Sequence, residues 1–254
     1  MNPKRFEGMT ALITGASSGI GAETAVRFGA EGAYVLAHYN SGGDAARRVL
    51  ERIREAGGDA ELLQSDLSCA EGVYRLVDLV RQSGRTVDTL VNNAGSLVKR
   101  TRFLDFTDDL WHLVFMLNFH SAYILTRELL PAMIERKRGC VVNVSSIAAR
   151  NGGGIGATAY ASAKAALTAM TKGLAREFGP AGIRVNAVEP GTIDTNYHKN
   201  FSTPQVLESI ANSTPLGRIG RSEDVAGVIA FLCSEDAAFI QGESIEVNGG
   251  FLML

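Results

Sequence analysis

The segment that most constrains the fold is a short apolar run that ends in a glycine-rich turn. The run covers residues 9–14, and the turn reads Thr-Gly-Ala-Ser-Ser-Gly-Ile-Gly from Thr14 to Gly21. Helix formers follow over residues 22–28. A strand, a glycine-rich turn and a helix in this order let backbone N–H groups and a helix N-terminus face a diphosphate. The spacing Gly-x-x-x-Gly-x-Gly is a weak signal alone, because a purely structural strand-to-helix turn shows it too.

The alternation of strand and helix patterns continues along the chain. Strands are expected near residues 33–39, 60–65, 89–91, 140–144, 183–188 and 244–247, and helices near 43–57, 70–83, 107–135, 160–178 and 222–232. Repeated units of this kind predict an α/β fold, a single doubly wound parallel sheet with helices on both faces. We expect one domain over residues 1–254, since no linker interrupts the composition. The polar segment at about 192–216 is a candidate lid.

Composition excludes several classes of function. The 25 basic and 27 acidic side chains give a net charge of -2, so neither nucleic acid nor an anionic membrane is an expected partner. The three cysteines and four histidines are scattered, which argues against disulfides, structural zinc and any metal site. No apolar leader or bilayer-length run is present. These features predict a soluble, cytoplasmic protein.

A proton-transfer pair is expected on the alanine-rich helix near residue 160. Tyr160 and Lys164 are four residues apart, so they share one helix face. A free phenol has a pKa of about 10, and a nearby ammonium favours the phenolate. Ser145 and Ser146 follow an apolar strand, at the end where parallel sheets place their ligands. The Tyr-x-x-x-Lys pattern alone also occurs on many surface helices.

The end of the second expected strand bears on cofactor choice. An acidic residue there would bind the 2′-hydroxyl of an NAD ribose. The residues present are His38, Tyr39, Asn40 and Ser41, and none of them is a carboxylate. A neutral edge rich in donors tolerates a 2′-phosphate, so NADP(H) is favoured over NAD(H). Arg47 and Arg48 are expected to be solvated helix positions.

Taken together and in order, these motifs resemble the short-chain dehydrogenase/reductase family over essentially the whole chain. The matching positions are Thr14–Gly21, Asp66, Asn92–Gly95, Asn118, Ser145–Ser146, Tyr160 with Lys164, Pro190–Gly191 and Thr195. The resemblance implies a Rossmann-type fold and an NAD(P)(H)-dependent oxidoreductase. It also implies interconversion of a carbonyl and a secondary alcohol by hydride transfer.

The resemblance further implies a role for each matching side chain. Tyr160 is the general acid/base, Lys164 lowers its pKa, Ser146 (rather than Ser145) holds the substrate oxygen, and Asn118 binds a water that relays protons. Ile193 and Thr195 are expected to contact the nicotinamide carboxamide, and Asp66 and Asn93 the adenine and ribose. The full set of implied cofactor contacts is Gly15, Ser17, Ser18, Gly19, Ile20, Gly21, His38, Tyr39, Asn40, Ser41, Asp66, Leu67, Asn93, Ala94, Gly95, Tyr160, Lys164, Pro190, Gly191, Ile193 and Thr195.

Two departures from the family pattern concern the substrate. The interval from Ser146 to Tyr160 is one residue longer than the commonest spacing and contains four glycines, which is expected to alter a pocket wall. Acyl-carrier-protein reductases tend to carry a basic residue at the position of Ala181, so this alanine weakens a carrier-protein substrate although Lys137 fits. A 3-oxoacyl thioester, a sugar or polyol and a small ketone all stay open. The loop charges Lys99, Arg100 and Arg102 could attract an anionic substrate or simply be solvated.

Assembly and a non-catalytic alternative complete the expectations. In the family the Tyr160 helix and the preceding helix with Trp111 pack against a neighbouring subunit, which implies a homotetramer. The apolar tail Phe251–Leu254 supports burial at an interface.

The alternative is a regulatory protein that senses a dinucleotide without turnover, although such a protein would have no use for the proton donor Tyr160.

Overall fold

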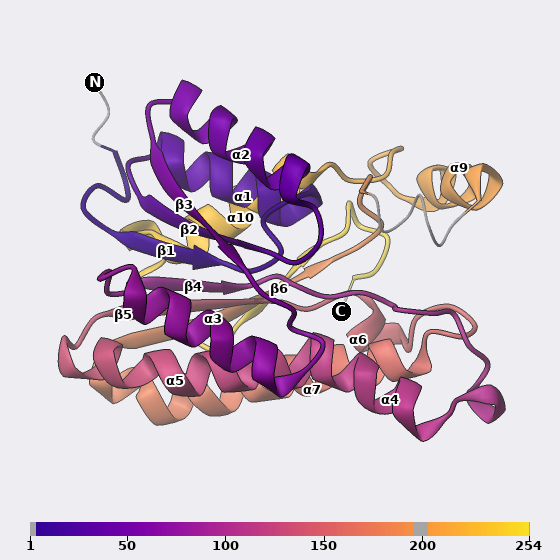
Figure 1. Ribbon diagram of the computed structural model, residues 1–254. Coiled ribbons are helices and arrows are strands. Elements are labelled where there is room, and N and C mark those ends of the chain that lie inside the picture. Colours follow the sequence, from indigo (N-terminus) through magenta and orange to yellow (C-terminus); the bar gives the residue numbers. More distant parts are fainter. Residues whose placement is uncertain (1–3, 196–202, 254) are drawn as a thin grey trace.

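The computed structural model describes residues 4–195 and 203–253 and contains one sheet covered by helices on both faces (Figure 1). The sheet has seven parallel strands in the order β3-β2-β1-β4-β5-β6-β7. The strands are β1 (Thr10–Ile13), β2 (Tyr34–Tyr39), β3 (Asp59–Gln64), β4 (Thr89–Asn92), β5 (Gly139–Val144), β6 (Ile183–Pro190) and β7 (Ser244–Val247). The predicted α/β, doubly wound parallel sheet is therefore confirmed.

Two layers of helices enclose this sheet. The helices are α1 (Gly19–Ala30), α2 (Gly43–Glu55), α3 (Ala70–Gln82), α4 (Asp108–Phe115), α5 (Ser121–Glu135), α6 (Ala148–Asn151), α7 (Thr158–Phe178), α9 (Pro204–Ser213) and α10 (Ser222–Cys233). Short turns of other helix types are η1 (Phe103–Asp105), η2 (Met116–His120), η3 (Gly179–Ala181) and η4 (Glu235–Ala237). Helices α1, α2 and α10 cover one face of the sheet, and α3, α5 and α7 cover the other (Figure 1).

The core follows from strands that are buried on both faces. Successive side chains of a strand point to opposite faces, so Ala11 and Ile13 of β1 join the core under α1 and α10. Leu12 joins the core on the other face, against α3 and α5. Every residue of β1 is buried, which explains why the run reads as continuously apolar rather than alternating.

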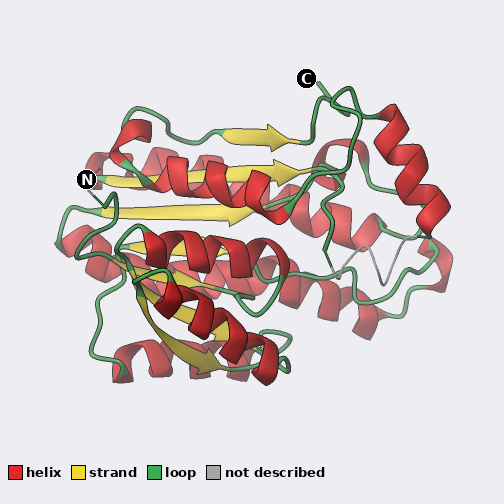
Figure 2. Ribbon diagram, turned by 90° about the horizontal axis from the view of Figure 1, so that it is seen from above, coloured by secondary structure: helices red, strands yellow, loops and turns green. Residues whose placement is uncertain are grey.

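Two segments differ from the expected pattern. The helix expected over 107–135 is interrupted by the π-helical turn η2, which contains Asn118. The segment 192–216, expected to be polar and irregular, contains helix α9. This helix begins with Thr203, whose hydroxyl oxygen accepts a hydrogen bond from Val206 N–H, and with a proline at its first position. Helix α9 lies on the side toward which the strands point (Figures 1 and 2).

Candidate active site

A cleft of about 1060 Å³ runs across the carboxyl ends of the central strands. Parallel sheets bind ligands at this edge, where the loops after the strands converge. Most of the predicted cofactor contacts line the cleft, namely Gly15, Ser17, Ser18, Gly19, Ile20, His38, Asn40, Ser41, Asp66, Leu67, Asn93, Ala94, Gly95, Tyr160, Lys164, Pro190, Gly191, Ile193 and Thr195. Ser145 and Ser146 after β5 also line it, so the structure gathers residues from six strand ends around one space.

The glycine-rich turn has the geometry that a diphosphate site needs. Gly15 and Gly19 have positive φ angles of 67° and 56°, a backbone conformation that L side chains rarely adopt. Helix α1 begins at Gly19, and Gly19 and Ile20 line the cleft, so the positive end of the helix dipole lies there. The first turn of α1 carries no acidic residue that would oppose an anion. A Cβ at Gly21 would lie 2.3 Å from Gly15 O, so Gly21 permits close packing of helix on turn rather than ligand contact.

Side chains from two neighbouring strands hold this turn in place. Gly15 N–H donates to His38 Nδ1 over 3.1 Å, and His38 Nε2 lies 3.1 Å from Ser65 O. Asn93 Nδ2 donates to Thr14 O over 2.7 Å. Burial lowers the pKa of His38 to about 4, against the opposing effects of Ser65 and Asp66. The imidazole is therefore neutral, with Nδ1 as acceptor and Nε2 as donor.

This geometry corrects one sequence-based expectation. The sequence-based expectation places His38 among the donors that tolerate a 2′-phosphate. Its ring is only 2% exposed and both nitrogens bond to backbone, so it supplies no donor to a phosphate. His38 positions the glycine-rich turn instead.

The rest of the expected ribose edge divides into two groups. Asn40 and Ser41 line the cleft, and Asn40 Nδ2 donates to Asp66 Oδ1 over 3.2 Å. Tyr39 does not line it, and its hydroxyl points toward Gln64 at 3.5 Å. Arg47 pairs with Asp44 on an exposed part of α2, as expected of a solvated position.

Tyr160 and Lys164 lie in the middle of the cleft, on the first turns of α7. Lys164 Nζ is 5.7 Å from the centre of the Tyr160 ring and donates to Val144 O over 2.7 Å. Burial lowers the pKa of Lys164 to about 8. Burial raises the pKa of Tyr160 above its ordinary value, although its hydrogen bond with Ser146 acts in the other direction. Desolvation of the phenol thus outweighs that hydrogen bond, and the lowering of the pKa of Tyr160 by Lys164 stays a prediction.

The two serines after β5 have different surroundings. Ser146 lines the cleft beside Tyr160, and its hydroxyl oxygen accepts a hydrogen bond from Ala148 N–H. Ser145 is 3% exposed, and its hydroxyl lies 3.0 Å from Lys164 O and 2.9 Å from Thr168 Oγ1. Ser145 therefore anchors α7 to β5, whereas the Ser146 hydroxyl faces the space where a substrate would lie.

Asn118 is buried behind the cleft wall in the π-helical turn. Its side-chain amide donates to Ser96 O over 2.8 Å and to Val114 O over 2.9 Å, and its oxygen accepts from Ser96 N–H. A Cβ at Gly95 would lie 2.7 Å from Asn118 Oδ1 and 3.0 Å from Lys164 Nζ. The missing side chain at Gly95 thus lets Asn118 and Lys164 approach the same point.

The substrate end of the cleft is walled mainly by apolar side chains. These are Leu117, Ala157, Ile155, Val206, Ile210 and Phe251. Of the three loop charges considered, only Arg100 lines this wall, and its guanidinium donates to Ile155 O over 2.8 Å. Lys99 and Arg102 are exposed outside it. Residues 196–202 of the predicted lid lie outside the described residues.

The sequence did not predict the hydrogen bonds of Thr14 or the buried position of Glu189. Thr14 Oγ1 accepts hydrogen bonds from the N–H groups of Asn93 and Ala94, and so joins the glycine turn to β4. Glu189 is a fully buried carboxylate near the end of β6, beside Arg150 and Thr168. An acid at the end of a strand that is buried along almost its whole length was the available signal, since a buried charge requires partners.

Two other kinds of feature are absent from the described ranges 4–195 and 203–253. No group of three or more His, Cys, Asp or Glu side chains there could hold a metal ion. None of the helices in those ranges is long and apolar enough to cross a membrane.

Comparisons with known proteins agree with this geometry. Residues 15–252 match a family model described as enoyl-(acyl carrier protein) reductase. The uncharacterized oxidoreductase YmfI of Bacillus subtilis is 43% identical over 246 residues, covering 95% of this chain and 98% of the relative. The 3-oxoacyl-[acyl-carrier-protein] reductase FabG of Pseudomonas aeruginosa is 36% identical over 248 residues, covering 98% and 99%.

Solved structures extend the likeness to bound cofactors. The angucycline C-6 ketoreductase LanV with bound NADP superposes with a TM-score of 0.89 at 33% identity, covering 98% of this chain and 97% of that one. A 7α-hydroxysteroid dehydrogenase complexed with NADH and 7-oxo glycochenodeoxycholic acid also has a TM-score of 0.89, at 34% identity, covering 98% and 96%. Similar chains therefore bind either nicotinamide cofactor.

Proposed function

The chain belongs to the short-chain dehydrogenase/reductase family of NAD(P)-dependent oxidoreductases, and from that premise we propose that it reduces a ketone to a secondary alcohol with Tyr160 as proton donor. The observation that carries the proposal is the Tyr160 phenol, which lies in the cleft, bonded to Ser146 and above the buried Lys164. The reverse oxidation uses the same groups with Tyr160 as base.

The described residues fit a nicotinamide dinucleotide. The positive-φ glycines, the free N-terminus of α1 and the length of the cleft suit a diphosphate flanked by two nucleosides. A bound cofactor of this type supplies the hydride. Pro190, Gly191, Ile193 and Thr195 line the cleft beyond Tyr160 and are proposed to hold the nicotinamide.

The protonation states suit reduction. A raised pKa keeps the proton on Tyr160 at neutral pH, so the phenol can give it to the substrate oxygen. Ser146 offers a second donor to the same oxygen, where negative charge develops. With a pKa of about 8, Lys164 is mainly charged at pH 7 and stabilises the phenolate left behind. Asn118, beside Lys164 at Gly95, is proposed to help return a proton through water.

We propose NADP(H) as the preferred cofactor. Asn40 and Ser41 are neutral polar side chains at the end of β2, and the one carboxylate nearby, Asp66, is already bonded to Asn40 and to Ser68 N–H. These hydrogen bonds fix the Asp66 carboxylate but leave it negatively charged, so the preference rests on the neutral side chains of Asn40 and Ser41 at the end of β2. The removal of His38 from the donor set leaves Asn40 and Ser41 to carry this preference.

The apolar wall at the other end favours a substrate with an apolar body. Ile155, Val206 and Phe251 are 83%, 47% and 42% exposed, so a ligand that covers them removes apolar surface from water. A ketone or 3-oxoacyl thioester fits this wall better than a free sugar or polyol does. The segment 192–216, with α9, is proposed as the lid of a single domain.

The exposed apolar tail supports assembly. Met253 in the tail is 80% exposed, and Phe239, between η4 and β7, is completely exposed. A lone subunit would gain stability by covering these apolar side chains. We propose a cytoplasmic homotetramer, with small-molecule substrates as its ligands.

The test is a spectrophotometric assay of NADPH and NADH oxidation over cyclic ketones, aliphatic ketones, 3-oxoacyl thioesters and sugars. Tyr160→Phe is expected to lower kcat by roughly a factor of 1000, because it removes the transferred proton. The dissociation constant for NADPH should stay within twofold by calorimetry. The matched control is Tyr123→Phe, which removes the hydroxyl of an exposed tyrosine on α5. Cofactor binding with no turnover of any substrate would favour the dinucleotide-sensing alternative.

A further inference from the structure

Three charged side chains that the proposed reaction does not use gather behind Ser146 and Pro190. They are Arg150 from α6, Glu189 from β6 and Glu246 from β7. Glu189 and Glu246 occupy paired positions of neighbouring parallel strands. Glu189 has a side-chain exposure of 0%, and the other two are 28% (Arg150) and 23% (Glu246) exposed. Two carboxylates thus share one guanidinium in a largely buried place.

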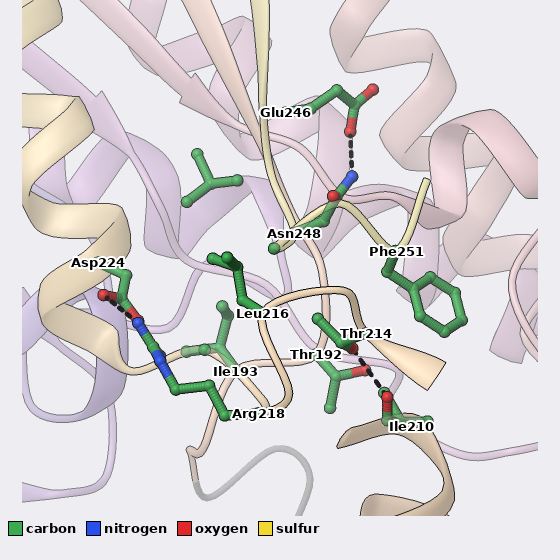
Figure 3. Close-up of a pocket in the computed structure, with 13 residues that line it drawn as sticks. Thr192, Ile193, Ile210, Thr214, Leu216, Arg218, Asp224, Glu246, Asn248 and Phe251 are labelled. Atoms are coloured by element: carbon green, nitrogen blue, oxygen red, sulfur yellow. Dashed lines mark hydrogen bonds and ion pairs between the residues drawn. The ribbon is translucent and has the colours of Figure 1, made fainter. Parts of the chain in front are cut away.

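The hydrogen bonds around the two carboxylates are unequal. Glu189 accepts a hydrogen bond at each oxygen, from Arg150 Nε at 2.5 Å and from Thr168 Oγ1 at 2.8 Å. Glu246 Oε2 accepts from Asn248 Nδ2 at 3.1 Å (Figure 3). Glu246 Oε1 is buried, lies 3.3 Å from Arg150 Nε and receives no hydrogen bond. A bare carboxylate oxygen in that position would be costly.

A proton on Glu246 removes this cost. The protonated Glu246 would donate a hydrogen bond to the Glu189 carboxylate. Its Oε1, which receives no hydrogen bond when ionised, would then donate one. Burial raises the pKa of Glu246 to about 7, and the hydrogen bond and negative charge of Glu189 act in the same direction. Arg150 and Asn248 oppose this rise. The electrostatics therefore agree with the hydrogen-bond geometry.

We propose that Glu246 holds one proton shared with Glu189, and that this pair, clamped by Arg150, positions Ser146 and the Pro190–Gly191 turn for the reaction. The inference rests on the proposed carbonyl reduction. All three residues act here as positioning residues, since the ion pairs and hydrogen bonds described for them are with protein groups.

The backbone connects the cluster to the catalytic segments. Arg150 N–H donates to Ile147 O, and Ile147 N–H donates to Pro190 O, so α6 ties the residue after Ser146 to the turn after β6. Gly191 N–H donates to Val247 O, next to Glu246. Repulsion between two ionised carboxylates would push β7 and β6 apart at this junction.

A second connection leads to the predicted lid and to α7. Asn248 Nδ2 also donates to Leu252 O in the tail, and Leu216 N–H, at the end of the lid segment, donates to Gly249 O. On the other side, Thr168 Oγ1 joins Glu189 to Ser145, which lies against Lys164 O. The shared proton thus lies where the substrate serine, the nicotinamide turn and the lid meet.

The other charged groups near Glu246 do not compete for its proton. A cavity of about 230 Å³ beside Glu246 is lined by Arg218, just after the lid segment, and by Asp224, from α10. These two neutralise each other in an ion pair of 2.6 Å (Figure 3). Helix α7 contributes only the neutral Thr168, and α6 contributes Arg150. Among the groups of this cluster, Glu246 is the one whose pKa of about 7 makes it change charge near neutral pH.

The test compares pH profiles of kcat/KM for the ketone with saturating NADPH in the wild type and in Glu246→Gln. The carboxamide can still donate to Glu189 but cannot ionise. The ratio of kcat/KM at pH 6 to that at pH 8 is expected to be about tenfold larger in the wild type, since one pH unit above an apparent pKa of about 7 leaves about one tenth of the acid form. The matched control is Glu243→Gln, which removes an exposed carboxylate just before β7 and should keep the wild-type profile.

Two outcomes would overturn the inference. One is an unchanged pH profile in Glu246→Gln, and the other is the same change in Glu243→Gln.

Arg150→Met should lower kcat at least tenfold while the KM for NADPH stays within twofold. Restoration of kcat by Arg150→Lys would show that the charge positions the pair.

Infrared difference spectra between pH 6 and pH 8 test the proton without any turnover. The carbonyl band of a protonated carboxylic acid should be lost from the wild type on this change and should be absent from Glu246→Gln at both pH values. If no ketone is reduced but this band behaves as expected, the proposed function fails and the shared proton stands. A wild-type protein without the band contradicts the shared proton itself.

Discussion

The two ends of the cleft are built in different ways. At the cofactor end, side chains of His38 and Asn93 bond to the backbone of the glycine turn, and Gly21 packs against Gly15 O without room for a Cβ. At the substrate end, the segment 152–156 carries four glycines and the nearly uncovered Ile155. Phosphate binding uses main-chain N–H groups, so the main chain must be held closely there, whereas substrates are recognised by side chains that can vary.

The largest expected effect concerns the acid stability of the cofactor end. Between pH 6.5 and about 4, the unfolded chain takes up a proton at His38 and the folded chain does not. The stability contributed by neutral His38 is present above pH 6.5 and is lost as the pH falls, by up to about 3 kcal/mol for a lowering of about 2.5 pKa units. Urea unfolding of the wild type and of His38→Asn from pH 4 to 7.5 measures it. Parallel stability curves for the two proteins would contradict the neutral, turn-holding imidazole.

A pair of glycine substitutions compares the two ends directly. Gly21→Ala forces a Cβ to 2.3 Å from Gly15 O and should destabilise the protein by about 2 kcal/mol and weaken NADPH binding. Gly154→Ala meets only the Arg100 guanidinium at 3.5 Å, so stability and NADPH binding should be unchanged while the KM for the ketone shifts. Denaturant midpoints and calorimetry give both quantities. Equal tolerance at the two positions would remove the distinction between the ends.

The smallest expected effect comes from a variant that tests the proposed preference for NADPH. Ser41→Asp places a carboxylate at the edge where a 2′-phosphate is proposed to lie, and repulsion should raise the KM for NADPH about tenfold with little change for NADH. Ser41→Asn keeps the side chain neutral and is the matched control. Measured KM values for both cofactors decide it. An equal rise in the KM values for NADPH and NADH in Ser41→Asp would show that Ser41 contacts a part of the cofactor that both share.

Much of the architecture was predictable because it depends on local pattern. The apolar runs that became β1 and β5, and the alanine-rich run that became α7, lie close to where they were expected. Helix α9 was not predicted, because a polar segment is also compatible with a loop. Thr203 and Pro204 nevertheless form a helix start signal. The π-helical turn around Asn118 had no local signature, since its tertiary contacts are with α7 and with Ser96.

The site likewise contains features that sequence motifs predicted and features that depend on tertiary packing. The positions of Tyr160, Lys164 and Ser146 in one cleft agree with their sequence motifs, and the separate duty of Ser145 became clear only from its contacts with Lys164 O and Thr168. The pKa of Tyr160 could not be read from its spacing to Lys164. Spacing along a helix reports a neighbour, whereas desolvation depends on everything packed around the phenol.

By itself the sequence determined the order of strands and helices, the glycine turn and the family, because each depends on residue types at short spacing. Only the tertiary structure decided that His38 holds a turn, that Glu189 meets Glu246 and that Arg150 joins them. These residues are 23 to 96 positions from their partners along the chain, as in Gly15 with His38 and Arg150 with Glu246. Their protonation states arise from burial, which no short stretch of sequence contains.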